Sequence, residues 1–152
     1  MATRCSRPGG DAELLVHDGL VGATIAGTCA AGLTLGSAWL WLAVATGALM
    51  GSSAATGVCP VHFVLAKIMK VPTRPGGDSE LKFHDALIGG LVAEIAVFAI
   101  HVNILAAWLG VATGAVMLSS AFTGFCPVHF LLKHLMGYGD EGGKAERLEA
   151  GE

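Results

Sequence analysis

The sequence is short of charge. Asp, Glu, Lys and Arg make up 14% of its 152 residues, whereas roughly 25% is usual in soluble domains. The charge is also unevenly placed, because residues 19–66 carry none of these four types and residues 87–132 carry only Glu94. This distribution argues against a soluble domain and against a nucleic-acid partner. It predicts an integral membrane protein whose main surroundings are the lipid bilayer.

Each uncharged run holds more than twice the about 20 apolar residues that one helix needs to cross a bilayer. We therefore expect an all-α integral membrane fold with four transmembrane helices, at 18–36, 38–58, 85–103 and 105–125. Proline is also scarce, but Pro60 and Pro127 follow the second and fourth of these helices. Because proline lacks the amide hydrogen, we expect these two residues to end or kink the helices and to start short interfacial helices.

The chain is a tandem repeat with an offset of 67 positions. Residues 41–63 match residues 108–130 at 18 of 23 positions, whereas 23–40 and 90–107 share 1 of 18. We expect two parallel two-helix repeats in one bundle, with the two similar second helices meeting near its axis. The predicted parts are an N-terminal arm (1–7), the first repeat (8–70), a linker (71–74), the second repeat (75–137) and a polar tail (138–152).

The basic residues predict the orientation. All nine Lys and Arg residues fall on one side of the four predicted spans, and the two predicted outer turns carry none. Basic residues near span ends favour the cytoplasmic side. We therefore expect a multi-pass protein of the bacterial inner membrane with both termini in the cytoplasm. Trp39, Trp41 and Trp108 should then lie at the outer interface, and Cys59 and Cys126 at the inner one.

A Cys-Pro-Val-His-Phe motif closes each repeat, and it allows three interpretations. A neighbouring cation favours the reactive thiolate, so Cys59 and Cys126 are candidate catalytic residues with histidine partners three residues later. The two motifs together also offer two sulfur and two nitrogen ligands, a set that suits zinc or copper. That candidate metal set is Cys59, His62, Cys126 and His129. The third interpretation is a small cysteine that only packs at a helix break.

A His-Asp pair recurs at the start of the first and third helices, as His17-Asp18 and His84-Asp85. The pair suggests a carboxylate-oriented histidine near the cytoplasmic face, within reach of the cysteine motif. His17 and His84 are also candidate cofactor ligands, for haem or a chlorin. Favourable helix-start chemistry is the plainer explanation. Glu94 is the only acidic residue inside a predicted span, and such a carboxylate marks a candidate functional site.

The two-span unit ending in Thr-Gly-x-Cys-Pro resembles the YgaP-like family of small inner-membrane domains. The matching residues are 56–60 and 123–127. Units of that family occur alone or attached to a rhodanese domain. The resemblance implies chemistry of thiols or sulfane sulfur for the two cysteines.

Three functional hypotheses follow. The first is a membrane protein that handles sulfane sulfur, thiol redox equivalents or a soft metal at the cytoplasmic face. The second is a non-catalytic accessory subunit of a larger membrane complex, or a homo-oligomer, that docks through glycine-rich helix faces. The third is a haem or chlorin carrier. The sequence has no hydrolase triad and no phosphate-binding glycine loop, so a non-enzymatic role is favoured.

Overall fold

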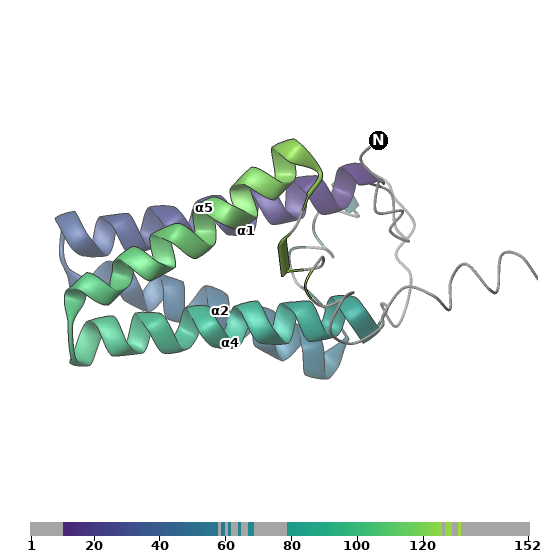
Figure 1. Cartoon of the computed structure of the whole chain (residues 1–152). Coiled ribbons are helices and arrows are strands. Elements are labelled where there is room, and N and C mark those ends of the chain that lie inside the picture. Colours follow the sequence, from purple (N-terminus) through teal and green to yellow (C-terminus); the bar gives the residue numbers. More distant parts are fainter. Residues whose placement is uncertain are drawn as a thin grey trace, which may run out of the picture.

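The structure is a computed structural model, and it describes residues 11–57, 59, 61, 64, 67–68, 79–125, 127–128 and 131. These residues form helices and contain no strand, in agreement with the predicted all-α class. The elements are α1 (Asp11–Thr34), η1 (Ser37–Trp39), α2 (Leu40–Thr56), α4 (Ser79–His101), η2 (Ile104–Ala106) and α5 (Ala107–Thr123). They make an elongated bundle whose two tight turns lie at one end and in which α1 begins at the other (Figure 1).

Three segments are long and apolar enough to cross a membrane: Ser37–Thr56, Lys82–His101 and Ile104–Thr123. They correspond to the second, third and fourth predicted spans. The predicted first span, 18–36, overlaps most of α1, which forms a helix of 24 residues but is not among these candidates. The reason is its composition, since α1 carries His17 and Asp18 and many Gly, Ala and Thr residues.

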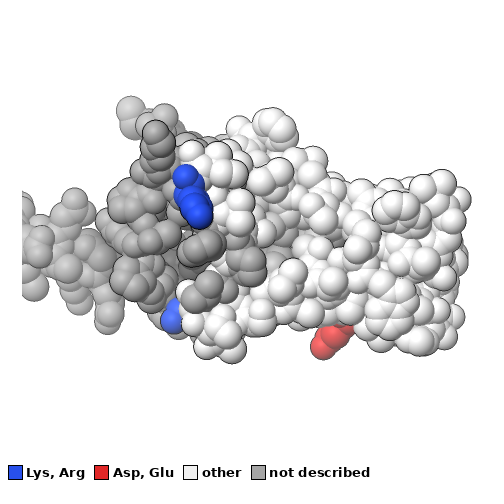
Figure 2. All heavy atoms as spheres, turned by 180° about the vertical axis from the view of Figure 1, so that it is seen from behind, with Lys and Arg blue, Asp and Glu red and all other residues white. Residues whose placement is uncertain are grey.

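The surface of these helices agrees with a lipid environment. Large apolar side chains are exposed along the described helices, for example Leu42, Leu91, Phe98 and Leu109. Figure 2 shows that, among the described residues of one face, the basic side chains gather at one end of the molecule and a single acidic group interrupts the uncharged helical surface. A broad apolar surface of this kind marks a contact with lipid or protein.

The helices pair across the two repeats. α1 packs along α5, and α2 packs along α4, whereas α2 and α5 make little contact. The expectation that the two similar second helices meet near the axis is therefore wrong. Each second helix packs on the first helix of the other repeat, so the core is made of two crosswise pairs.

Glycine allows both crosswise pairs to approach closely. A Cβ atom on Gly114 would lie 2.5 Å from the Ala26 amide nitrogen and 2.7 Å from the Gly22 carbonyl oxygen. At the other crossing, a Cβ atom on Gly89 would lie 2.6 Å from the Gly47 carbonyl oxygen. These crossings are equivalent under the repeat offset. Small residues at helix crossings are the usual way in which membrane helices pack tightly.

A size exchange distinguishes the two crosswise pairs. A Cβ atom on Gly110 would lie 2.5 Å from the Cys29 sulfur, and the Cys29 side chain is completely buried. At the equivalent positions of the other pair stand Ala43 and Ala96, both completely buried. One pair thus combines a larger and a smaller residue, and the other combines two of intermediate size. This exchange shows how α1 and α4, the first helices of the two repeats, could diverge in sequence while their packing was kept.

This exchange can be tested by a double substitution. We expect Gly110→Ala to lower the free energy of unfolding by about 1–3 kcal/mol, because the new methyl group has no space beside Cys29. Adding Cys29→Ala should recover most of that loss, because it recreates the alanine pair of the other half. Thermal unfolding of the purified protein in mild detergent measures both effects. A double variant that is no more stable than Gly110→Ala would contradict this account of the packing.

The second helix of each repeat ends at a glycine. Gly57 and Gly124 have φ of 72° and 67°, and their amides donate to the carbonyl oxygens of Ser53 and Ser120. This left-handed cap is a common helix ending because glycine has no Cβ atom to hinder it. The expectation that Pro60 and Pro127 end or kink the two helices is corrected, since α2 ends at Thr56 and α5 ends at Thr123, before the prolines.

The end of the bundle that holds the two turns carries an open cavity of about 570 Å³, lined by residues 32–37 and 99–104. Those two segments are repeat equivalents, so the cavity is itself symmetric. The tryptophans are also at this end: Trp39 lies in η1, and Trp41 and Trp108 lie in the first turns of α2 and α5. All three indole rings are exposed, as expected of residues at a membrane interface.

Candidate functional site

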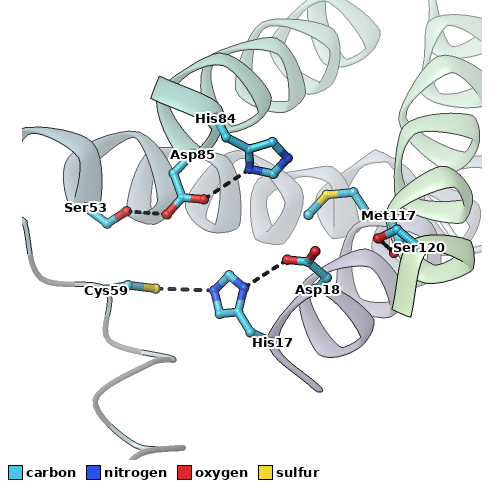
Figure 3. Close-up of polar contacts among 8 residues, drawn as sticks. All are labelled: His17, Asp18, Ser53, Cys59, His84, Asp85, Met117 and Ser120. Atoms are coloured by element: carbon cyan, nitrogen blue, oxygen red, sulfur yellow. Dashed lines mark hydrogen bonds and ion pairs between the residues drawn. The ribbon is translucent and has the colours of Figure 1, made fainter. Parts of the chain in front are cut away.

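The opposite end of the bundle brings a cysteine, a histidine and an aspartate together. The Cys59 sulfur lies 3.5 Å from Nε2 of His17, and Nδ1 of the same ring lies 3.3 Å from Oδ1 of Asp18 (Figure 3). Asp18 and His17 come from α1, whereas Cys59 follows the glycine cap of α2. A histidine that is oriented by a carboxylate and contacts a thiol is the arrangement that activates nucleophilic cysteines.

Burial shapes the charges of this site. His17 and Asp18 are buried, and Cys59 is partly buried. His17 lies outside the three candidate spans. Burial by itself lowers the pKa of the His17 imidazole, but hydrogen bonds with Asp18 and Cys59 and the charges of both groups outweigh it. They raise the pKa of His17 from 6.5 to about 9, so the ring is an imidazolium at neutral pH.

The second repeat builds an equivalent pair from His84 and Asp85, which are also buried. Nδ1 of His84 lies 3.4 Å from Oδ1 of Asp85. The other carboxylate oxygen, Oδ2, accepts a hydrogen bond of 3.1 Å from the Ser53 hydroxyl of α2 (Figure 3). The helix α2 thus contacts one His-Asp pair through Ser53, and the segment that follows it contacts the other pair through Cys59. A buried carboxylate held in this way anchors the end of α2.

The structure places some of the predicted site residues together and does not describe others. The structure brings His17 next to Cys59, in agreement with the expectation that the His-Asp pair lies within reach of the motif. Cys59 does not lie in a helix, so a helical spacing to a histidine three residues later does not apply. His62, Cys126 and His129 lie outside the described residues.

The predicted metal and cofactor sites stay predictions. Within the described residues there is no group of three or more His, Cys, Asp or Glu side chains placed to hold a metal ion. Three of the four proposed metal ligands lie outside that part of the chain. His17 and His84, the candidate haem or chlorin ligands, are both buried, and each ring already contacts the aspartate that follows it.

Lys82 is a site residue that sequence reasoning missed. Its ammonium nitrogen lies 3.6 Å from the position that a Cβ atom would take on Gly57, two residues before Cys59. The signal was present in the repeat, because the equivalent position in the first unit is Leu15. A residue that changes from apolar to cationic within an otherwise similar segment deserves a functional explanation.

Glu94 is exposed on α4, within one of the candidate spans. The neighbouring Gly90, one turn earlier, is also exposed, and a Cβ atom there would meet nothing within 4 Å. The ring of His101, about two turns later on α4, makes an edge contact with Trp41, with the ring centres 6.4 Å apart. Glu94 therefore faces outward from the bundle.

No family model, curated protein or solved structure matches this chain. The resemblance to the YgaP-like family therefore depends on the Thr-Gly-x-Cys-Pro segments and the two-helix pattern alone.

Proposed function

We propose that this chain is a small membrane protein that accepts sulfane sulfur on Cys59. The observation that carries the proposal is the line of contacts from the Cys59 sulfur through the His17 ring to Asp18. A positively charged imidazole beside a thiol favours the thiolate, which is the nucleophilic form. Partial exposure of Cys59 leaves it accessible to a small molecule. The resemblance to units that accompany rhodanese domains points in the same direction.

The chemistry needs only groups at this site and one sulfur donor. The Cys59 thiolate attacks the outer sulfur of a persulfide, R–S–SH. A new sulfur–sulfur bond forms, the bond between that sulfur and R–S breaks, and R–S⁻ leaves with the bonding electrons. The leaving thiolate takes a proton from the His17 imidazolium, so the products are a Cys59 persulfide, R–SH and neutral imidazole. The sulfur atom passes from one thiol to another, and no external oxidant is required.

The proposal includes the membrane arrangement. The predicted first span, which begins at residue 18 of α1, joins the three candidate spans as a fourth, and both termini lie in the cytoplasm of a bacterium. Lys67 and Lys82 support this orientation, because they follow α2 and begin α4 at the end opposite the turns. In this arrangement Cys59 receives sulfur at the inner face of the membrane.

A second candidate is an accessory subunit of a larger membrane complex, and exposed Glu94 favours it. An ionised carboxylate facing lipid near the centre of a span costs about 2.5–3.5 kcal/mol on the insertion scale for acidic residues. A partner helix with a basic or hydrogen-bonding residue at the same depth would remove that cost. The open surface beside Gly90 would admit such a helix closely.

Native mass spectrometry after gentle extraction from the protein's own membranes distinguishes the two candidates. Before it, the membranes are treated with a small persulfide. We expect a species heavier by one sulfur atom, with the added sulfur on the peptide that contains Cys59. Cys59→Ser should abolish that modification, whereas Cys29→Ser, at a completely buried site in α1, should leave it unchanged.

Two results together would refute the proposal of a sulfur acceptor. The chain would gain no sulfur from the persulfide, and Cys59 would be alkylated as slowly as an ordinary cysteine. If that unmodified chain occurred only within a larger assembly, the accessory role would take its place. In that case the Cys59–His17 contact would act only to join α1 to the end of α2.

A further inference from the structure

The first cysteine site has a cation that comes from the second repeat. Lys82 lies in the first turn of α4 and is half-buried, and its ammonium nitrogen approaches the left-handed turn at Gly57. Both the ammonium nitrogen and the preceding carbon, Cε, lie within 4 Å of the Cβ position of Gly57. Within residues 11–57 and 79–125, no ion pair joins the Lys82 ammonium to a carboxylate. A half-buried ammonium is an unusual feature on a chain with so little charge.

The two repeats differ at this position. The repeat equivalent of Lys82 is Leu15, which carries no charge. A Cβ atom on Gly124, the equivalent of Gly57, would meet nothing within 4 Å. The two turns have almost the same backbone, with φ of 72° and 67°. The described difference between the two glycine turns is therefore one of charge and not of backbone shape.

Two cations thus lie near the segment that holds Cys59. The His17 imidazolium contacts the sulfur directly, and the Lys82 ammonium stands beside the turn that leads to it. His17 contacts Asp18, and Lys82 adds a second positive charge that can attract an anion. An anion that approaches the Cys59 thiolate would otherwise be repelled, because like charges repel strongly where little water screens them.

We infer that Lys82 selects an anionic sulfur donor for Cys59, such as thiosulfate or the persulfide of a small thiol that carries a carboxylate. The inference rests on the proposed function, because it names the substrate class of the same site. Lys82 acts by holding the anionic part of the donor while its outer sulfur is attacked. With thiosulfate, Cys59 takes the outer sulfur and sulfite leaves with the electrons of the broken sulfur–sulfur bond, so the total charge of minus three is conserved.

Charge-matched thiol reagents test this inference on the full-length protein. Methanethiosulfonates transfer an alkylthio group to a thiolate and release methanesulfinate, and they exist in anionic (sulfonatoethyl) and neutral (methyl) forms. The ratio of the two modification rates at Cys59 reports the local charge and not the intrinsic reactivity. We expect Lys82→Leu to lower the anionic-to-neutral ratio roughly threefold to tenfold, as expected for loss of one partly screened charge.

Two further measurements complete the experiment. Lys82→Arg keeps the positive charge and should keep the ratio of the native protein, and added salt should reduce the ratio in the native protein more than in Lys82→Leu. A ratio that Lys82→Leu leaves unchanged, while Cys59 remains reactive, would overturn the selection by Lys82 and leave the sulfur acceptor intact. A Cys59 that reacts slowly with both reagents would instead refute the proposed function itself.

Discussion

Gly114→Ala and Gly89→Ala should each strongly destabilise the protein. The added methyl group would lie 2.5 Å from the Ala26 amide nitrogen in the first case, and 2.6 Å from the Gly47 carbonyl oxygen in the second. Both contacts are with backbone atoms, which cannot rotate away as a side chain can. The paired helices would have to separate, at a cost of about 1–3 kcal/mol or more. For a chain of this size that corresponds to a fall in Tm of roughly 2–12 °C.

The chain supplies matched controls for this prediction. Gly90 is the next residue on α4 and Gly51 lies one turn after Gly47 on α2, and a Cβ atom on either would meet nothing within 4 Å. Gly90→Ala and Gly51→Ala should therefore unfold at the native temperature or slightly above it, since alanine favours a helix more than glycine does. Thermal unfolding in one detergent at a fixed scan rate gives the comparison. Equal losses at Gly89 and Gly90 would contradict the crosswise packing.

His17→Ala should slow the alkylation of Cys59 by neutral iodoacetamide roughly tenfold at pH 7, because an ordinary cysteine is only a few per cent thiolate at that pH. The physical reason is the loss of the imidazolium that contacts the Cys59 sulfur at 3.5 Å. Half-maximal labelling should then require a higher pH than in the native protein. The measurement is the labelling rate of the peptide that contains Cys59 between pH 5 and 10.

His84→Ala is the control, because His84 occupies the equivalent position of the second repeat and is buried to almost the same extent. Cys59 labelling should fall much less in His84→Ala than in His17→Ala. If both variants slowed labelling equally, a general loosening of the site would explain the result and the specific contact would not.

Protonation of His17 also makes the stability of the folded protein depend on pH. The pKa of His17 is raised in the folded state, from 6.5 to about 9. A raised pKa means that the folded protein binds the proton more tightly than the unfolded chain does. The stabilisation is therefore complete below about pH 6.5 and is lost as the pH rises through about 9. The free energy of unfolding of the native protein should therefore fall between about pH 6.5 and 9. That of the His17→Ala variant should fall less over the same interval.

Much of the fold could be predicted from the repeat and the uncharged runs. The constant offset established which positions are equivalent, and the runs indicated where the helices lie. The repeat could not establish whether α1 packs against the second helix of its own repeat or of the other repeat. Both α2 and α5 carry glycine residues that suit close packing. Only the close approaches of Gly22 to Gly114 and of Cys29 to Gly110 distinguish the two arrangements.

The site was predicted in part for a similar reason. The recurrence of His-Asp and Cys-Pro at one offset indicated that both belong to one site. The sequence prediction extended the helix as far as the proline. Instead, Gly57 caps it, and Thr-Gly before a break is typical of a helix end. The contribution of Lys82 depends on how α4 lies beside the end of α2, which no local pattern contains.

Crosswise pairing has a consequence for synthesis. The surface of α1 around Gly22 is completed by Gly114, which the ribosome adds about 90 residues later, or roughly 5–20 s at ordinary elongation rates. During that interval α1 lacks its native neighbour. An intertwined dimer in which two chains exchanged their α5 helices would bury the same surfaces and would need no new contact.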